Sequence, residues 1–294
     1  MESKLKRLMI IVNPFSGTGS KEKVPSLIES LIDKSSFEYV IENVEREGHV
    51  AELSRRAIDE GFYGVVAVGG DGTVNGAATA LRGSDVALAI VPCGSGNGLA
   101  RHLGIPLNMK GAIQVINNDK VEPLDYCMLN DTPFVCTCGM GFDAVVADSF
   151  ARKSHRGAVT YVRTAIEEYM HFKPTHYRLE IDGKEIEVDA FVIACANAAQ
   201  YGNNAFIAPH ASMQDGMLDV VVMTPFKRLE SPIMGINLFT KRLDKNRHVT
   251  IYRTPRVVIH RPEADVMHVD GEPLMMPADL TVTCHSAGLK MFVP

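Results

Sequence analysis

The feature that most constrains the fold is a glycine-rich turn at residues 69–75, directly after the apolar run 65–68. Its sequence, GGDGTVN, has three glycines in four positions, so a phosphate group can approach the backbone N–H groups. Thr73 and Asn75 are short polar residues of the kind that begin a helix, and Asp71 can orient the amides or hold a magnesium ion. The pattern predicts a phosphate-binding turn between a buried strand and a helix. A turn that only connects the two elements is the alternative.

Two further turns of the same character follow other apolar runs. Residues 8–12 precede NPFSG at 13–17, and residues 86–91 precede PCGSGNG at 92–98. Ligands in open α/β sheets bind outside the carboxyl ends of the strands, so three such turns together predict a nucleotide site. Neither the GxxxxGK[ST] P-loop nor the GxGxxG dinucleotide pattern is present. The candidate nucleotide-binding residues are Asn13, Pro14, Phe15, Ser16, Gly17, Gly69, Gly70, Asp71, Gly72, Thr73, Val74, Asn75, Gly94, Ser95, Gly96 and Asn97.

The first 125 residues alternate apolar runs with helical patterns, which is typical of βα units around a parallel sheet. We therefore expect a Rossmann-like α/β domain at residues 1–125, with its nucleotide site at the carboxyl edge of the sheet. Strands are expected at 8–12, 37–44, 65–68 and 86–91, and helices at 23–32, 49–60, 75–81, 98–103 and 111–117.

The pattern changes near Asp125, where short apolar runs separated by Asp-Gly turns begin. These runs predict an antiparallel β-sandwich at residues 126–294, with the option that the last residues pack back on the first domain. The cleft between the two domains is the expected ligand site. Strands are expected at 134–138, 177–181, 185–188, 190–194, 218–223, 248–253, 256–260, 265–269 and 280–285, and one helix at 158–172.

Composition narrows the partners and the compartment. The net charge of −5 and the absence of tryptophan argue against a nucleic-acid partner. None of the six cysteines forms a CxxC pair; Cys136 and Cys138 could share a strand face, but buried structural cysteines in a reducing compartment are favoured. No stretch approaches the ~20 apolar residues of a membrane span, and the first apolar run is too short for a signal peptide. We expect a cytoplasmic protein that reaches any membrane-embedded substrate from the surface.

The three turns together resemble the catalytic domain of the diacylglycerol kinase and sphingosine kinase family, and bacterial soluble lipid kinases most of all. The resemblance runs over nearly the whole chain, through GMGFDA at 139–144, Asn197, Tyr201-Gly202, DGMLD at 215–219 and VDGEP at 269–273. It implies a nucleotide domain followed by a β-sandwich, with ATP in the cleft and a lipid hydroxyl as phosphate acceptor. The GGDGT element alone is less specific, because NAD kinases and phosphofructokinases share versions of it.

The resemblance also implies individual roles. Asp71 is the key acidic residue of the nucleotide site, and Glu272 matches the general base. Ser212, Asp215 and Met217 match a structural Mg²⁺ site, with backbone oxygens from Ser212 and Met217. Phosphoryl transfer to a hydroxyl needs neutralised phosphate charge and a carboxylate that accepts the proton, which agrees with these assignments. An exposed hairpin glutamate and a plain turn aspartate are the alternatives for Glu272 and Asp215.

Several departures from the family pattern leave the lipid undecided. Gly98 follows Asn97 where bacterial diacylglycerol kinases often carry an aspartate, and residues 94–100 look more like sphingosine kinases. Val44 stands where a threonine is usual, which puts a hydroxyl contact to the nucleotide in doubt. The alternatives are a sphingoid-base kinase, an NAD kinase and a nucleotide-binding regulator without catalysis.

Basic residues lie beside apolar ones in two places. Such clusters can dock a protein on anionic lipid, whereas a solvated charged face is the plain alternative. We expect reversible, peripheral contact with the membrane that carries the lipid substrate. A homodimer is compatible with the sandwich, whose edge strands can pair between subunits. The clusters are Arg152, Lys153, His155 and Arg156, before the expected helix, and Lys241, Arg242, Lys245 and Arg247, after Ile236, Leu238 and Phe239.

Overall fold

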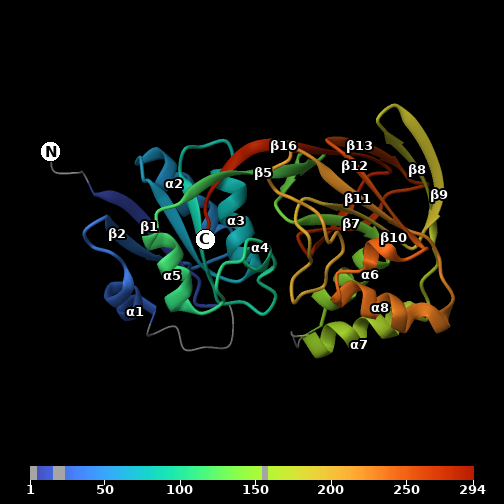
Figure 1. Ribbon diagram of the computed structural model, residues 1–294, viewed down its shortest axis with the longest axis horizontal. Helices are drawn as coiled ribbons and strands as arrows, with labels where there is room; N and C mark the ends of the chain where they lie inside the picture. Colours follow the sequence, from blue (N-terminus) through green and yellow to red (C-terminus); the bar gives the residue numbers. More distant parts are fainter. Residues whose placement is uncertain (1–4, 16–23, 154–157) are drawn as a thin grey trace. The chain divides into compact units, whose positions relative to one another are not determined.

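The computed structural model describes residues 5–15, 24–153 and 158–294 of the chain (Figure 1). The chain divides into two compact units: unit 1 is Met1–Leu124 with Ala287–Pro294, and unit 2 is Asp125–Ser286. The last strand crosses this division, and Ala287 takes a left-handed φ of 56° at the crossing. Among the described residues, no helix is both long enough and apolar enough to cross a membrane.

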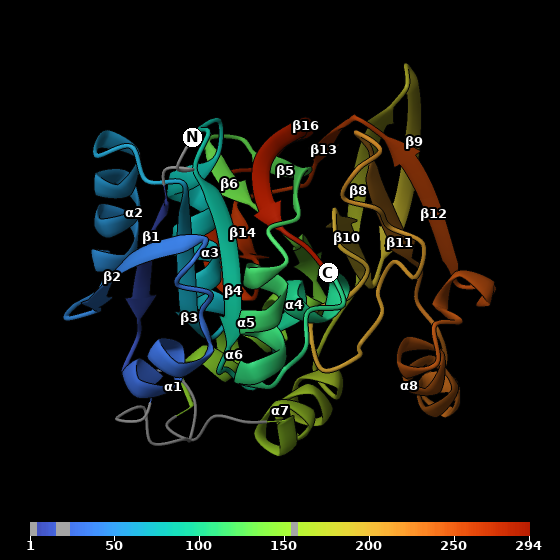
Figure 2. The same ribbon diagram turned by 60° about the vertical axis from the view of Figure 1, so that its left-hand side comes forward.

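Unit 1 is built on a parallel sheet. Its elements are β1 (Lys6–Val12), α1 (Val24–Leu31), β2 (Phe37–Asn43), α2 (His49–Asp59), β3 (Gly64–Gly69), α3 (Asp71–Leu81), β4 (Ala87–Pro92), α4 (Gly98–His102), α5 (Met109–Asn117) and the start of β5 (Val121–Leu129). The strand order is β2-β1-β3-β4, and every residue of β3 and β4 is buried. Helices α2 and α3 pack together, as do α1 and α5 (Figure 2). Continuous apolar strands are what a sheet covered by helices on both faces requires.

Unit 2 is an antiparallel β-sandwich with helices. Its elements after β5 are β6 (Thr132–Phe134), β7 (Thr137–Gly141), α6 (Phe142–Ala151), α7 (Ala158–Tyr169), β8 (Thr175–Ile181), β9 (Lys184–Ala190), β10 (Val192–Ala196), β11 (Leu218–Met223), η2 (Arg228–Glu230), α8 (Ser231–Phe239), η3 (Leu243–Lys245), β12 (Val249–Thr254), β13 (Arg256–His260), β14 (Asp265–Val269), β15 (Glu272–Met276) and β16 (Asp279–Phe292). One sheet has the order β12-β11-β10-β7-β14-β15; β16, β13, β8 and β9 form the other side, with β5 and β6 joined through β16.

The central strands of unit 2 separate two hydrophobic clusters by simple alternation of side chains. In β10, Ile193 and Cys195 join the core between the two sheets, whereas Ala194 faces a second cluster. That second cluster contains Met234 of α8 and Leu243 of η3, with Phe142, Tyr169 and Phe172 packed against it. The helices of unit 2 therefore cover the outer face of the six-stranded sheet. Strands β10 and β11 of this sheet are buried on both faces, which explains why they read as apolar runs.

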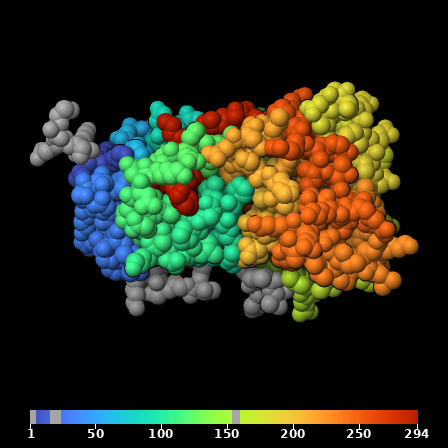
Figure 3. Space-filling model, in the orientation of Figure 1, coloured from blue at the N-terminus to red at the C-terminus, as the bar shows by residue number. Residues whose placement is uncertain are grey.

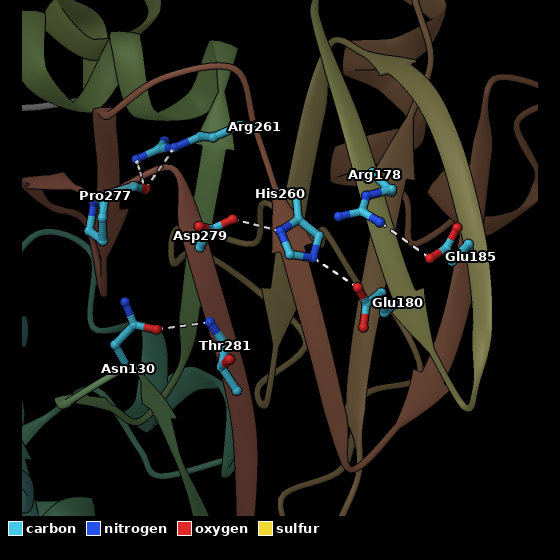
Figure 4. A network of polar contacts seen from close by, with 9 residues as sticks. All are labelled: Asn130, Arg178, Glu180, Glu185, His260, Arg261, Pro277, Asp279 and Thr281. Carbon is cyan, nitrogen blue, oxygen red and sulfur yellow. Dashed lines mark hydrogen bonds and ion pairs between the residues drawn. The ribbon is translucent and has the colours of Figure 1, made fainter.

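A network of polar side chains on the surface joins strands β16, β13, β8 and β9 of the second sheet of the sandwich (Figure 4). His260 of β13 bridges two neighbouring strands, because its Nδ1 lies 2.6 Å from Asp279 of β16 and its Nε2 lies 2.9 Å from Glu180 of β8. Hydrogen bonds to these carboxylates, to Asp279 first and then to Glu180, raise the pKa of His260 above its ordinary value. Arg178 and Glu185 pair across the next two strands at 3.2 Å.

The expected α/β domain followed by a β-sandwich is confirmed, and the differences are local. Helix α3 begins at Asp71 rather than at residue 75, because the turn glycines adopt the helical start themselves. The single strand expected at 134–138 is two strands, β6 and β7. Strands β5 and β15 and helices α6 and α8 were not expected. Helix α8 was not predicted because its own side chains are apolar on both its exposed and its buried side, so the sequence lacks the periodic signal of an amphipathic helix.

Candidate active site

Three turns of unit 1 lie next to one another because their strands end in register. Val12 of β1 pairs with Val68 of β3, and Val68 pairs with Val91 of β4. The residues after these positions therefore emerge at one edge of the sheet. The backbone continues this alignment past the strands, since the N–H of Asn13 donates to Val68 at 3.0 Å and that of Cys93 donates to Gly69 at 2.7 Å.

The first two turns are joined by side chains. Nδ2 of Asn13 donates to Oγ1 of Thr73 at 2.9 Å, and Oδ1 of Asn13 accepts the N–H of Phe15 at the same distance. Thr73 also explains Gly69, because a Cβ at Gly69 would lie 2.3 Å from Oγ1 of Thr73. The ring of Phe15 is 76% exposed. Ser16 and Gly17, which complete the candidate turn, lie outside the described residues.

Asp71 joins the second turn to the third. Its two carboxylate oxygens accept the N–H groups of Asn97 at 2.9 Å and Gly98 at 2.7 Å, at the start of α4. The glycines of the third turn permit this approach: a Cβ at Gly96 would lie 2.6 Å from Oδ2 of Asp71, and one at Gly94 would lie 2.6 Å from Cα of Gly70. Asp71 thus orients backbone amides, and the glycines supply space rather than unusual backbone angles.

The remaining predicted nucleotide residues share this edge. Gly70 caps α3, whose first turn contains Gly72, Thr73 and Val74, so the amino end of the helix opens where the turns meet. The positive end of the helix dipole suits a phosphate there, while the N–H groups of Thr73 and Val74 donate to the carbonyl of Gly70. Thr73 and Val74 are themselves buried and hold the helix against the sheet. Pro14, Ser95 and Asn75 complete the set at the described part of this edge.

Glu272 of unit 2 stands at the start of β15, on a hairpin with β14. The hairpin turn is Asp270-Gly271, with φ values of 51° and 88°, so both residues are left-handed as a two-residue hairpin turn requires. The Glu272 side chain is exposed. Exposure at a rigid turn leaves the carboxylate available to solvent and to a ligand. The sequence predicted this turn correctly from the Asp-Gly pair.

Asp270 fixes that hairpin to the rest of the sheet. Its carboxylate accepts three backbone N–H groups, from Val135 at 2.9 Å, Cys136 at 2.8 Å and Thr137 at 2.9 Å. Its own N–H donates to Thr137 at 2.8 Å. Burial raises the pKa of Asp270, and the three backbone hydrogen bonds oppose that change. Sequence reasoning assigned no role to Asp270, although VDGEP places it two residues before the predicted base.

The loop with the predicted magnesium ligands is tied to Asp125. Oδ2 of Asp125 accepts the N–H of Gly216 at 2.7 Å, and its N–H donates to the carbonyl of Met213 at the same distance. Asp215 uses Oδ1 to accept the N–H of Met217 at 3.0 Å and pairs through Oδ2 with Arg253. Ser212 accepts the N–H of Gln214. Asp125 was missed as a site residue because its contact is with a loop 91 positions away.

Carboxylate and backbone oxygens in this loop are the donors that Mg²⁺ prefers, so the residue types fit that ion. Arg253 already neutralises Asp215 and competes with a cation for the same oxygen. Within residues 5–15, 24–153 and 158–294, no group of three or more His, Cys, Asp or Glu side chains could hold a metal ion. All six cysteines are free, and burial raises the pKa of Cys138, which faces Cys195 across β7 and β10.

A buried polar network lies behind the Glu272 hairpin. Oδ2 of Asp143, at the start of α6, accepts from Tyr201 at 2.8 Å and lies 3.1 Å from Nε2 of His268 on β14. A Cβ at Gly139 would lie 2.2 Å from the same oxygen. Burial raises the pKa of Tyr201 well above its usual range. GMGFDA and Tyr201-Gly202 are sequence signals for this network, but only the fold reveals that they meet at His268.

Comparisons with known proteins identify the two domains of the chain. Residues 7–129 match the family described as diacylglycerol kinase catalytic domain, and residues 136–293 match the YegS C-terminal NAD kinase beta sandwich-like domain. The chain is 27% identical to a "Diacylglycerol kinase" of Mycobacterium tuberculosis over 98% of its own length and 95% of that protein.

A "Probable lipid kinase YegS-like" of Pseudomonas putida is 28% identical over 84% of this chain and 82% of that protein. A crystal structure described as a diacylglycerol kinase of Bacillus anthracis has the same fold, with a TM-score of 0.76 at 20% identity over 99% of this chain and 98% of that one. Because the two domain matches together span most of the sequence, the chain belongs to the diacylglycerol kinase and YegS-like lipid kinase family.

Proposed function

We propose that this protein is an ATP- and Mg²⁺-dependent kinase that transfers the γ-phosphate to a hydroxyl of diacylglycerol or a related lipid. The observation that carries the proposal is the joining of three glycine-rich turns by Asp71, Asn13 and Thr73 at one edge of the unit 1 sheet. Three glycine-rich turns held in place at the amino end of α3 leave room for the phosphates of ATP without a P-loop lysine. Family membership supports the kinase class.

Glu272 is the proposed general base for the lipid hydroxyl. A base for this proton must be a carboxylate that is free to meet the acceptor, and Glu272 is exposed on a turn that Asp270 holds. When bound with ATP, Mg²⁺ would offset phosphate charge. A second, structural Mg²⁺ is proposed at Asp215 with backbone oxygens of Ser212 and Met217, and Arg253 would have to release Asp215 for that ion to bind.

The direct test is a kinase assay with labelled ATP and a mixed lipid panel, comparing the wild type with Glu272→Gln. Loss of a positioned base lowers phosphoryl transfer by about 10²–10⁴-fold, while an exposed substitution leaves the fold intact. Glu263→Gln, another exposed glutamate of unit 2, is the matched control and keeps wild-type activity. Unchanged turnover in Glu272→Gln rejects the assigned base.

A sphingoid-base kinase is the second candidate, because Gly98 stands where bacterial diacylglycerol kinases often carry an aspartate. The labelled product distinguishes the candidates in the same assay. Phosphatidate supports the first proposal, a sphingoid phosphate supports the second, and labelled NADP in a parallel reaction with NAD rejects both. Nucleotide binding without any labelled product indicates a regulator.

A further inference from the structure

Helix α8 has apolar side chains exposed to solvent, although side chains of this kind are usually buried in a protein core. Its sequence, SPIMGINLF, contains no charged residue. Met234 and Leu238 point inward and pack on the second hydrophobic cluster of unit 2. The outward residues form what we call the α8 surface: Leu229, Ile233, Ile236 and Phe239, which are 90%, 55%, 61% and 54% exposed.

The spacing of these residues makes the surface continuous. Ile233, Ile236 and Phe239 are spaced three residues apart, so they form one stripe along α8, and Leu229 lies on η2, directly before the helix. Figure 3 shows the orange segment that contains α8 at the molecular surface. Extended exposed apolar surface of this kind marks an interaction site on an otherwise ordinary globular protein.

The end of α7 extends the same surface. Tyr169 stacks on Phe226 with ring centroids 6.0 Å apart, and Arg228 donates to the carbonyl of Met170 at 3.4 Å. These contacts place the end of α7 beside η2. Ile166 of α7 and Met170, the first residue after it, are 64% and 51% exposed. Two helices from distant parts of the sequence therefore offer apolar stripes around one contact.

The charge of the residues around α8 indicates what kind of partner the α8 surface binds. Residues 226–248 contain six basic residues and two acidic ones, a net charge of +4, in a chain whose net charge is −5. Lys227 and Arg228 precede the apolar stripe, and Lys241 and Arg242 follow it. Apolar side chains with basic residues at both ends suit the interface of an anionic bilayer, where the apolar groups enter the acyl boundary and the cations meet lipid headgroups.

We propose that the α8 surface docks the protein on anionic lipid bilayers. The proposal deepens the proposed function, since it names the surface from which a membrane-embedded acceptor would be reached. It also sharpens the expectation from sequence: the second basic cluster flanks the apolar stripe. In the first cluster, Arg152 pairs with Asp148 and Lys153 with Glu167, while His155 and Arg156 lie outside the described residues.

The test is vesicle flotation of the full chain without ATP, on phosphatidylcholine alone and on phosphatidylcholine mixed with phosphatidylglycerol. We expect binding to the anionic vesicles that weakens with salt. Ile233→Gln with Ile236→Gln lowers the partition coefficient by at least about tenfold, since two half-exposed isoleucines no longer enter lipid. Arg242→Gln with Lys245→Gln, which halves the net charge of residues 226–248, lowers it by about fivefold per charge at low salt and weakens the salt dependence.

The matched control is Leu27→Gln with Val40→Gln, two apolar residues of unit 1 that are 41% and 42% exposed and that leave binding unchanged. Equal flotation of wild type and α8 variants overturns the proposal, as does absence of wild-type binding. If the α8 substitutions instead convert a dimer to a monomer in analytical ultracentrifugation and leave flotation unchanged, the surface is an interface between copies and the proposal is wrong.

Because flotation contains no ATP, its result does not depend on the kinase reaction. Activity of the α8 variants is measured separately, with a detergent-dispersed lipid. Retained activity there together with lost flotation supports both proposals. Flotation that follows the expected pattern in a protein without kinase activity rejects only the proposed function.

Discussion

The two units hold their candidate site residues with an aspartate beside glycine, but the glycines serve different purposes. In unit 1, Asp71 accepts two backbone N–H groups; a side chain at Gly96 would collide with Asp71, and one at Gly94 would collide with Gly70. In unit 2, Asp270 accepts three, and Gly271 has nothing within 4 Å of an added Cβ but a φ of +88°. One turn is limited by space and the other by backbone torsion.

The comparison teaches that similar short motifs can preorganise a site by different physics. Under the proposed function, the crowded turn would lie against the phosphates of ATP, whereas the left-handed turn would position a single side chain, Glu272. The first arrangement suits a multiply charged phosphate and the second suits one proton transfer. Substitutions at each turn should therefore fail in different ways.

The largest effect on stability is expected from removing the two aspartates. Asp270→Ala leaves three N–H groups of a buried segment without an acceptor and lowers the free energy of unfolding by about 3 kcal/mol or more. Asp71→Ala leaves two and costs about 2 kcal/mol. Denaturant unfolding measures both. Asp131→Ala, at an exposed turn, is the control. Equal losses for Asp71 and the control would show that Asp71 does not hold its turn.

Smaller losses of stability are expected at the turn glycines, where one glycine is required for space and the other for its backbone torsion. Gly94→Ala forces the backbone of residue 70 to move and costs about 1–3 kcal/mol, as overpacking does. Gly271→Ala costs about 1–2 kcal/mol, the penalty of a left-handed alanine. In α8, Gly235 has neither limit, so Gly235→Ala is neutral or stabilising by up to about 1 kcal/mol.

ATP binding and turnover should also distinguish Gly94→Ala from Gly271→Ala. Gly94→Ala weakens ATP binding measured by calorimetry, and Gly271→Ala lowers turnover without weakening it. The distinction between the two turns fails if both variants weaken ATP binding equally.

The smallest effect concerns pH. The pKa of His260 is raised in the folded chain, so the folded state binds this proton more tightly than the unfolded state does. The resulting stabilisation is complete below the ordinary pKa of 6.5 and is lost as pH rises through the raised value. Since the site is at the surface, we expect less than about 1 kcal/mol.

Thermal unfolding on either side of pH 6.5, in wild type and His260→Gln, measures this term. The variant should lose the wild-type decline in stability across that range. An identical pH dependence in both proteins would assign the decline to another group.

The positions of most strands along the chain, the three glycine-rich turns and the Asp-Gly hairpin could be predicted because each depends on neighbouring residues. Glycine, asparagine and aspartate favour turns through their own backbone preferences. Asp125, Asp143 and His268 could not be found in this way, since their partners lie 91, 58 and 125 positions away. Helix α8 was missed because its exposed side is as apolar as its buried side.

The sequence by itself determined that residues 69–75 form a tight turn after a buried strand and that Glu272 follows a hairpin turn, because local torsion and side-chain bulk decide both. Only the tertiary structure decided which backbone N–H groups donate hydrogen bonds to Asp71 and Asp270. It also decided that the apolar stripe of α8 faces solvent. Those outcomes depend on strand register and on packing between distant segments, which no local pattern encodes.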